Sequence, residues 1–428
     1  MTALQSVFAL EQFGIKLGLD NIRALCQALG GPQRAFATVI VAGTNGKGSV
    51  TAMVDRALIA AGHRSGRYTS PHLVRVEERF AIDGVEIETP ALERAAARTL
   101  GAIDDLLARG VLHAPPTFFE ATTAIAFDVF REAGVEIAVL EVGLGGRLDA
   151  TNVAGALAVA ITSIDRDHEQ QLGSSLEQIA LEKAGVIKAG RPVVVGAMTD
   201  GPRGAIARVA AERGAPLLEA TPAGGCRASC HPEDGTVALA TPLREYPRLT
   251  LGLPGMHQVA NALVAVRLLE AIDAAGIPVG AEAIVSGLRD VRWPGRLEWI
   301  RVEGGELLLD AAHNPAGARS LAAHLSASAP LPLVFGVMKD KDVGGMLGAL
   351  APVVSRVIAT EARTPRALAA NEVARRARQA FPALDVVCLA DPVEACRAAL
   401  ADARRAVVAG SIFLIGEVRG RLANDIVR

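Results

Sequence analysis

Cysteine is scarce in this chain, and the few cysteines present are poorly spaced for disulfides or metal binding. The 428 residues include five of them, Cys26, Cys226, Cys230, Cys388 and Cys396. The number is odd, and no two form the CxxC pair that structural zinc sites use. We therefore expect free thiols in a reducing compartment, and we predict a cytoplasmic protein.

Basic clusters, long apolar stretches and a leader segment are lacking as well. The formal net charge is −2 and no run of basic residues stands out, so we expect no nucleic-acid surface. No stretch of about 18 apolar residues is free of charge, which predicts no membrane span. Residues 1–6 have neither a charged region nor a continuous apolar run, so we expect no secretory leader. These absences favour a globular protein that works neither on nucleic acid nor in a membrane.

What the chain does have is a large apolar fraction in a regular order. Hydrophobic residues make up 50% and charged residues 21%, enough for a large core. Apolar runs of strand length alternate with helical patterns, which predicts an α/β fold with a mostly parallel sheet. At 292–296 Pro and Gly stand beside Trp, which is typical of a linker. We predict a P-loop-containing, mostly parallel sheet domain at 1–293 and a smaller Rossmann-like α/β domain at 294–428.

The same patterns give approximate bounds for the main elements. In the first domain we predict strands at 135–142, 157–164 and 191–197, helices at 50–61, 119–133, 174–188 and 256–275, and a short β excursion at 224–247. In the second we predict strands at 297–302, 306–310, 332–337, 355–360 and 384–389, with a helix from 316.

One segment predicts a phosphate site. The apolar strand Val39–Ala42 leads into the Gly-rich loop Gly43–Ser49, and backbone N–H groups of such a loop bind anionic oxygens. Lys47 would reach the terminal phosphates and Ser49 would hold Mg²⁺. The common P-loop pattern is not met, because Val41 stands where its first glycine would be and an extra glycine separates the lysine from the serine. An ordinary tight turn is the alternative, but lysine and serine at this spacing favour phosphate.

Polar residues at strand ends predict a metal beside that loop. Glu141 ends an apolar strand and is followed by the glycine-rich stretch 143–146, where a ligand can approach the backbone. Asp165 ends the next predicted strand, and His168 follows three residues later. Because Mg²⁺ prefers oxygen, a histidine ligand would need carboxylate charge nearby. Lys183 lies on the following helix, where an exposed lysine is the alternative.

The second predicted domain repeats this arrangement. Asp310 ends an apolar strand and opens the segment 310–315, which includes His313, and Ser411 follows another strand. Polar residues at strand ends in both domains imply a site in the cleft between them.

Together these segments resemble the folylpolyglutamate synthase/dihydrofolate synthase family, part of the Mur ligase superfamily. The most specific match is EVGLGGRLDATN at 141–152 with EKAG at 182–185. The other matching segments are 43–49, 70–73, 117–120, 167–168, 255–258 with Asn261, 294–296 and 310–315. A small departure is alanine at 311–312, where glycine is common in the family.

The resemblance implies ATP as co-substrate and two Mg²⁺ sites. Ser49, Ser70 and Glu141 would hold one ion. Glu141 and His168 would hold the second, together with Lys183 carrying a CO₂-derived carbamate. Such a carbamate supplies an anionic oxygen ligand in place of an ammonium that would repel the metal.

The resemblance also implies which residues bind the nucleotide and the substrates. The nucleotide residues would be Asn45, Gly46, Lys47, Gly48, Ser49, Asn261, Arg296 and Asp310. The pterin-bearing substrate would contact Leu17, Gly18, Leu19, Thr117, Phe118, Phe119, Glu120, Leu148, Asp149 and Ala150. Lys47, Lys183, His313 and Ser411 would serve catalysis, the last two near the glutamate and the transferred phosphate.

The implied activity is an ATP-dependent ligase that adds L-glutamate to dihydropteroate and to folates through an acyl phosphate, in a monomer. A synthase active on folates alone is the nearest alternative. A UDP-muramoyl peptide ligase fits less well, because 117–120 and 148–150 match the folate branch. A P-loop switch protein that makes no ligation product is a further alternative, disfavoured by the polar strand ends of a second domain.

Overall fold

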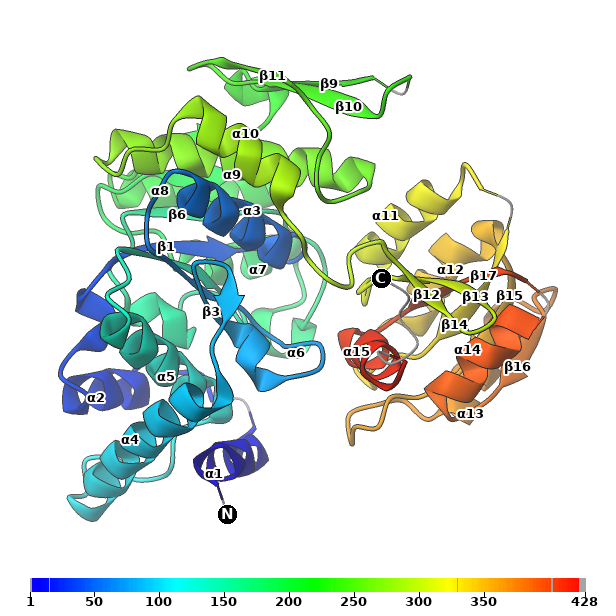
Figure 1. The fold of residues 1–428 in the computed structure, drawn as a ribbon, viewed down its shortest axis with the longest axis horizontal. Helices are drawn as coiled ribbons and strands as arrows, with labels where there is room; N and C mark the ends of the chain where they lie inside the picture. Colours follow the sequence, from blue (N-terminus) through cyan, green and yellow to red (C-terminus); the bar gives the residue numbers. More distant parts are fainter. Residues whose placement is uncertain (1, 15, 232, 329, 402, 423–428) are drawn as a thin grey trace. The chain divides into compact units, whose positions relative to one another are not determined.

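The computed structural model describes residues 2–14, 16–231, 233–328, 330–401 and 403–422, coloured along the chain in Figure 1. The chain divides into two compact units. Unit 1 comprises Met1–Pro71, Val76–Gly252 and Gln258–Arg292. Unit 2 comprises Trp293–Arg428 and two short earlier segments, His72–Arg75 and Leu253–His257.

Unit 1 is built on an eight-stranded sheet with the order β4-β3-β2-β5-β1-β6-β7-β8. From β2 to β8 the neighbouring strands in this order are parallel, and β3 and β4 are antiparallel additions at one edge. The strands are β1 (Ala37–Ala42), β2 (Ser65–Tyr68), β3 (Phe80–Ile82), β4 (Val85–Glu86), β5 (Ile137–Glu141), β6 (Ala158–Ile161), β7 (Val193–Val195) and β8 (Leu217–Glu219). The central strands β1 and β5 are buried and almost wholly apolar because helices cover both faces of the sheet.

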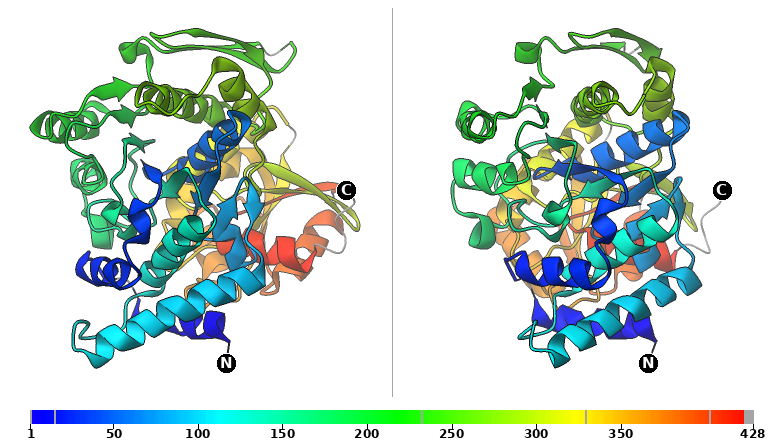
Figure 2. Two further views of the ribbon diagram at one scale, coloured as in Figure 1. Left: turned by 60° about the vertical axis from the view of Figure 1, so that its left-hand side comes forward. Right: turned by 90° about the vertical axis from the view of Figure 1, so that its left-hand side faces the viewer.

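Helices surround this sheet. They are α1 (Ala3–Ala9), α2 (Asp20–Ala28), α3 (Lys47–Ala60), α4 (Thr89–Ala108), α5 (Phe118–Glu132), α6 (Glu169–Leu172), α7 (Leu176–Ala184), α8 (Asp200–Glu212), α9 (Met256–Ala274) and α10 (Ala281–Asp290). The long helix α4 packs along α5, as Figure 2 shows in cyan and teal. Arg98 of α4 joins this pair by donating to the buried Asp128 of α5 at 2.8 Å. Helix α10 packs so closely on α3 that only glycine fits at Gly287, opposite Ala57.

A small antiparallel sheet lies beside α9 in unit 1, where the sequence predicts a β excursion. Its strands are β9 (Arg227–His231), β10 (Thr236–Ala240) and β11 (Glu245–Leu249). The buried carboxylate of Glu270 on α9 holds it in place. That carboxylate accepts hydrogen bonds from Thr241 at 2.6 Å and Tyr246 at 2.9 Å, and it pairs with Arg267 at 2.5 Å.

Unit 2 has a six-stranded sheet with the order β12-β13-β17-β14-β15-β16, parallel except for the edge strand β12. The strands are β12 (Glu298–Val302), β13 (Gly305–Leu309), β14 (Leu331–Phe335), β15 (Val354–Ala359), β16 (Val386–Cys388) and β17 (Arg405–Ala409). The helices are α11 (Pro315–Leu325), α12 (Val343–Leu350), α13 (Ala370–Ala380), α14 (Pro392–Ala401) and α15 (Ile412–Arg421).

Alternate residues of these strands enter two separate cores. Leu308 and Leu333 pack with α11, α12 and α13, whereas Leu307 and Val334 pack with α14 and α15. Strands β13 and β17 are neighbours whose following helices, α11 and α15, lie on opposite faces. In open α/β sheets this arrangement leaves a crevice at the carboxyl ends of the strands, where ligands bind.

The predicted α/β class and the parallel sheets are confirmed, and the differences are local. Helix α3 begins at Lys47, not at residue 50, because Gly46 in the left-handed region starts the helix turn. Strand β6 ends at Ile161, so Asp165 lies in the loop beyond it. The sequence prediction did not include α1, α2, α4, α6, α8 or α10, although α4 and α10 each bury an apolar face. None of the helices in the described ranges combines the length and apolar character needed to cross a membrane.

The core of unit 1 depends on a cluster of phenylalanines on α5. Phe127 is fully buried, and its ring centroid lies 6.3 Å from that of Phe36. We expect Phe127→Ala to lower the free energy of unfolding by about 3–5 kcal/mol, because it removes a buried ring and leaves a cavity. Phe8→Ala is the matched control, since Phe8 is 36% exposed. Urea unfolding of both variants measures the effect, and equal losses would contradict the assignment of Phe127 to the core.

Candidate active site

The loop between β1 and α3 is shaped by two glycines in conformations that other residues rarely adopt. Gly43 has φ 144° and Gly46 has φ 83°. A Cβ on Gly43 would overlap Thr162, and one on Gly46 would overlap the side-chain oxygen of Asn261. Thr162 and Asn261 therefore pack directly against the backbone of the loop. The loop leads into the first turn of α3, whose free N–H groups can bind an anion.

Two lysines point at one oxygen of this loop. Lys47 Nζ donates to the carbonyl oxygens of Gly43 and Thr44, both at 3.1 Å. Lys183 Nζ, from the last turn of α7, donates to the same Gly43 oxygen at 2.8 Å. Burial, and next the charge of Lys47, lower the pKa of Lys183 from 10.5 to about 7. Lys183 is therefore a buried amine with a large neutral fraction near pH 7, and the exposed alternative is wrong.

The residues that follow β6 form hydrogen bonds with the backbone and side chain of Asn45 in this loop. The N–H of Asn45 donates to Ser163 Oγ at 3.1 Å, and the carbonyl of Asn45 accepts from Thr162 Oγ1 at 2.5 Å. The side-chain nitrogen of Asn45 lies 3.5 Å from Asp165 Oδ2. Asp165, predicted to end a strand, thus contacts the glycine-rich loop.

The predicted Mg²⁺ ligands of the first site include two that are close together. Glu141 is the last residue of β5, and its Oε2 accepts a hydrogen bond from the N–H of Ser70 at 3.2 Å. Ser49 is 1% exposed in the first turn of α3, and its Oγ accepts from Gln258 Nε2 at 3.3 Å. Gln258 also accepts from Asn261 Nδ2 at 2.9 Å. Sequence reasoning gave Gln258 no role, although it lies one helical turn before Asn261 on the same face.

These donors suit a hard cation only in part. Hydroxyl and carboxylate oxygens from Ser49, Ser70 and Glu141 are the ligand type that Mg²⁺ prefers. Within the described ranges no group of three or more His, Cys, Asp or Glu side chains is placed to hold a metal. His168 directly precedes α6 as its N-cap, with φ 51°, and its Nε2 lies 3.9 Å from Asp167 Oδ1. A second cation would therefore need an additional anionic oxygen, which a carbamate on Lys183 would supply.

The segment 117–120 begins α5 and caps it. Thr117 Oγ1 accepts from the N–H of Glu120 at 3.2 Å, and Glu120 Oε2 accepts from the N–H of Thr117 at 2.7 Å. Both side chains are buried and serve as a capping box, a signal that the sequence pattern T-x-x-E already carried. Phe118 and Phe119 lie between these two residues in the chain. The Phe119 ring centroid lies 6.0 Å from that of Tyr68, and a Cβ on Gly143 would overlap the Phe119 ring.

The segment 148–150 belongs to a tightly bonded loop after β5. Asp149 Oδ2 accepts from the N–H groups of Gly143 and Leu144, both at 3.0 Å, and its Oδ1 accepts from Thr151 N–H at 3.0 Å. Asp149 is 5% exposed, and these three hydrogen bonds to its carboxylate fix the conformation of the loop. Leu148 is half-buried and Ala150 is buried beside it.

That loop is joined directly to the end of α7 that carries Lys183. Arg147 N–H donates to the carbonyl of Glu182 at 2.8 Å, and its guanidinium pairs with the Glu182 carboxylate at 2.9 Å. Asn152 Nδ2 donates to the carbonyl of Gly185 at 3.3 Å, and Lys188 Nζ donates to Asn152 Oδ1 at 2.8 Å. The loop after β5 and the C-terminal end of α7 are therefore held together by several hydrogen bonds and an ion pair.

The segment Leu17–Leu19 precedes α2. Leu17 is 51% exposed, Gly18 is half-buried, and Leu19 is buried as the residue before α2. Lys16 Nζ donates to the carbonyl of Pro115 at 3.4 Å, which brings this segment beside the loop before α5.

In unit 2 the predicted residues lie at the carboxyl ends of β13 and β17. Asp310 is buried, and its two oxygens accept from the N–H groups of Leu297 at 3.0 Å and Ala312 at 2.9 Å. Burial raises the pKa of Asp310, against the charges of Arg296 and His257. His257 is a further residue of this cluster to which the sequence gave no role.

The other two predicted residues of unit 2 are placed by local bonds. His313 Nδ1 lies 2.8 Å from the carbonyl of Ala311. Ser411 is buried, and its Oγ accepts from Phe413 N–H at 3.1 Å as the N-cap of α15.

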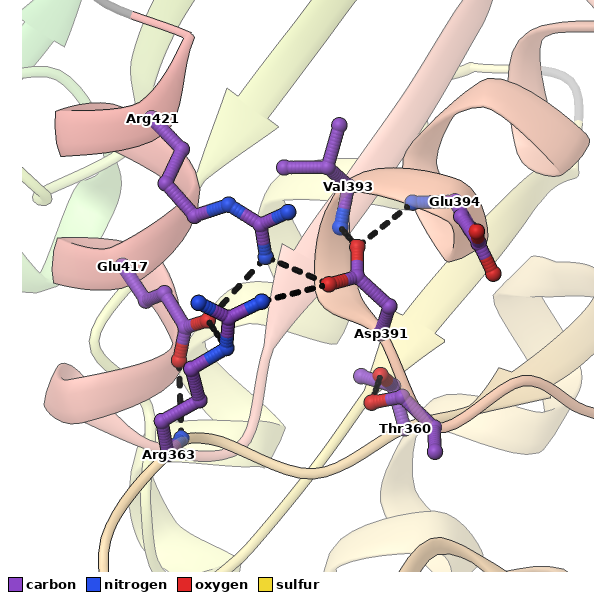
Figure 3. A network of polar contacts seen from close by, with 8 residues as sticks. Thr360, Arg363, Asp391, Val393, Glu394, Glu417 and Arg421 are labelled. Atoms are coloured by element: carbon purple, nitrogen blue, oxygen red, sulfur yellow. Dashed lines mark hydrogen bonds and ion pairs between the residues drawn. The ribbon is translucent and has the colours of Figure 1, made fainter.

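A second polar network in unit 2 lies at the ends of β15 and β16, shown in Figure 3. Asp391 accepts from the N–H groups of Val393 and Glu394 at the start of α14, and from Arg421 at 2.6 Å. These bonds hold the pKa of Asp391 at about 2, with Arg421 the largest cause. The carboxylate fills the anion position of this helix terminus, so the network is structural.

Comparison with known families agrees with this geometry. Residues 109–269 match the Mur ligase middle domain, and residues 295–414 match the Mur ligase glutamate ligase domain.

Two curated relatives illustrate the similarity. A Mycobacterium tuberculosis dihydrofolate synthase/folylpolyglutamate synthase is 38% identical over 395 residues, covering 85% of this chain and 78% of that protein. A probable bifunctional folylpolyglutamate synthase/dihydropteroate synthase of Haloferax volcanii is 37% identical over 374 residues, covering 85% of this chain. The match spans 43% of the length of the Haloferax protein.

Solved structures are similar over nearly the whole chain. E. coli FolC in complex with DHPP and ADP has a TM-score of 0.87 at 31% identity, covering 99% of this chain and 98% of that one. A bifunctional folylpolyglutamate synthase/dihydrofolate synthase with Mn, AMPPNP and L-glutamate bound has a TM-score of 0.84 at 33% identity, with the same coverage. The chain therefore belongs to the dihydrofolate synthase/folylpolyglutamate synthase family of the Mur ligases.

Proposed function

We propose that this protein is an ATP-dependent ligase that joins L-glutamate to dihydropteroate, forming dihydrofolate, and to the γ-carboxyl of folates. The observation that carries the proposal is the meeting of Lys47 and Lys183 at the Gly43 oxygen. These two amines lie at the glycine-rich loop that follows β1. Glu141 ends the neighbouring parallel strand β5, at the same carboxyl end of the sheet. Residues 1–293 would form the ATP-binding domain and 294–428 the glutamate ligase domain, in a cytoplasmic monomer.

The chemistry follows from the poor reactivity of a carboxylate. A carboxylate oxygen of the pterin-bearing substrate attacks the γ-phosphorus of ATP, ADP leaves, and an acyl phosphate forms. The amine of L-glutamate then attacks the acyl carbon, phosphate leaves, and the amine proton is lost. Lys47 and the loop N–H groups stabilise the charge on the transferring phosphoryl group. Asn261, Arg296 and Asp310 would hold the nucleotide.

The remaining assigned residues complete the two substrate sites. His313 and Ser411 would lie near the glutamate and the transferred phosphate. Phe118, Phe119 and the segments 17–19 and 148–150 would bind the pterin side.

Bound Mg²⁺ would neutralise phosphate charge, held in one site by Ser49, Ser70 and Glu141 and in the other by Glu141, His168 and modified Lys183. The neutral Lys183 amine would form an N–C bond to CO₂ and release one proton. Its lowered pKa supports this, since an amine of pKa 10.5 is almost wholly protonated at neutral pH.

The experiment that tests the proposed function is a product assay. Purified protein with ATP, Mg²⁺ and L-glutamate is given dihydropteroate in one reaction and tetrahydrofolate in another. We expect dihydrofolate from the first and the diglutamate from the second, because both carboxylates need the same activation. Product from the folate alone would favour a folate-specific synthase. ATP hydrolysis without either product would contradict the ligase.

Lys47 provides a test of the phosphate site. We expect Lys47→Ala to lower kcat by about 10² or more, because one charge on the transferring phosphoryl group is lost. Lys47→Arg keeps the charge and should recover part of the activity. Thermal midpoints of both variants check the fold. Near-normal turnover of Lys47→Ala would contradict the assignment.

Lys183 provides a test of the carbamate. With carbon-13-labelled bicarbonate, NMR should show a carbamate signal that is weak at about pH 6 and strong at about pH 8. The sign follows from the pKa of about 7, since the reactive neutral amine predominates only above it.

Substitutions at two lysines with lowered pKa values separate the carbamate from other labelled groups. Lys183→Ala should abolish the signal and the ligase activity. Lys188→Ala is the matched control, because Lys188 also has a lowered pKa, of about 8, yet its amine is bonded to Asn152. A signal that survives in Lys183→Ala would overturn the carbamate proposal.

A further inference from the structure

A buried arginine lies on the wall of the proposed pterin site and has no role so far. Arg79 ends the short 3₁₀ turn Val76–Arg79, directly before β3, and is 7% exposed. Its guanidinium carbon lies 5.1 Å from the centroid of the Phe118 ring. The arginine thus packs over one of the two aromatic rings assigned to the pterin-bearing substrate.

The neighbours of Arg79 fix the orientation of its guanidinium group. It is hydrogen-bonded to the Tyr68 side chain, and the hydroxyl of Tyr68 is itself fixed by Thr122 at 2.8 Å and Thr123 at 3.3 Å. Tyr68 lies on β2 next to Phe119, with ring centroids 6.0 Å apart. The guanidinium is therefore oriented by the same residues that line the aromatic wall.

The charge of Arg79 also reaches the reaction end of the site. Among the carboxylates that act on it are Glu11 and Glu141, and Glu141 is the proposed metal ligand. Burial lowers the pKa of Arg79, yet a guanidinium keeps its charge in proteins. A desolvated, permanent cation that packs on Phe118 and interacts electrostatically with Glu141 attracts an anion far more strongly than an exposed one.

We propose that Arg79 binds the carboxylate of the pterin-bearing substrate that the enzyme activates. This inference rests on the proposed function. The substrate carboxylate enters beside Glu141 and the ATP phosphates, so a cation must offset the added negative charge. The planar guanidinium can donate two parallel hydrogen bonds to the two oxygens of a carboxylate. Arg79 would thus select substrates that carry a carboxylate at this position, and each bound oxygen would keep a lone pair for attack on phosphorus.

The test compares two ligands that differ only in this group. The probes are dihydropteroate and its analogue that lacks the carboxyl on the aniline ring, titrated into the full chain with fluorescence detection. We expect Arg79→Leu to weaken binding of dihydropteroate about 10- to 100-fold, the range for hydrogen bonds to a charged group. Binding of the analogue should change less than about threefold.

Controls separate this role from packing. Arg79→Lys keeps the charge without the planar guanidinium and should give a smaller loss for dihydropteroate alone. Arg94→Leu removes an exposed arginine of α4 and should change neither affinity. Unchanged binding of the analogue shows that a variant is folded.

Three results would overturn the proposal. Equal weakening of both ligands in Arg79→Lys and Arg79→Leu would assign Arg79 to packing. Unchanged binding of dihydropteroate in Arg79→Leu would exclude contact with the carboxylate. Wild-type protein that binds neither ligand would contradict the proposed function itself, and with it the inference.

Discussion

The carbonyl oxygen of Gly43 is the point on which the site of unit 1 depends. A glycine is required there, because a Cβ would overlap Thr162 on the neighbouring strand end. The peptide then turns its oxygen toward two lysines from helices that follow different strands. Two amines on one oxygen repel each other, and this repulsion adds to burial in keeping Lys183 partly neutral near pH 7.

The second constraint is the joint between the loop after β5 and the end of α7. Arg147 and Asn152 bond to the backbone at Glu182 and Gly185, on either side of Lys183. Backbones approach so closely there that a Cβ at Gly146 would meet the carbonyl of Lys183. A shift of the loop that carries Leu148–Ala150 is therefore transmitted to the end of α7.

Several residues assigned to ligands also hold the scaffold. Thr117 and Glu120 close the start of α5, Asp149 fixes its own loop, and Ser411 caps α15. The backbone groups that these side chains satisfy would otherwise be buried without partners. These side chains therefore have structural roles whether or not they also contact a ligand.

Much of this protein was determined by short-range sequence patterns. The glycine-rich loop after Val39–Ala42, the acid at the end of β5 and the capping box at Thr117 are local signals, because turn geometry and helix ends depend on adjacent residues. The parallel sheets likewise follow from the alternation of apolar strands and helices. The class of fold and the glycine-rich loop between β1 and α3 were therefore predictable.

The tertiary structure alone decided which of these segments meet. Strands β5 and β6 flank β1 although they come much later in the chain, and this order brings Glu141 and Thr162 to either side of the loop. It also places Gln258 against Ser49, Lys183 against Gly43 and Arg79 over Phe118. No periodicity encodes such pairs, because they depend on the packing of whole elements, and desolvation of Lys183 and Arg79 exists only once that packing has formed.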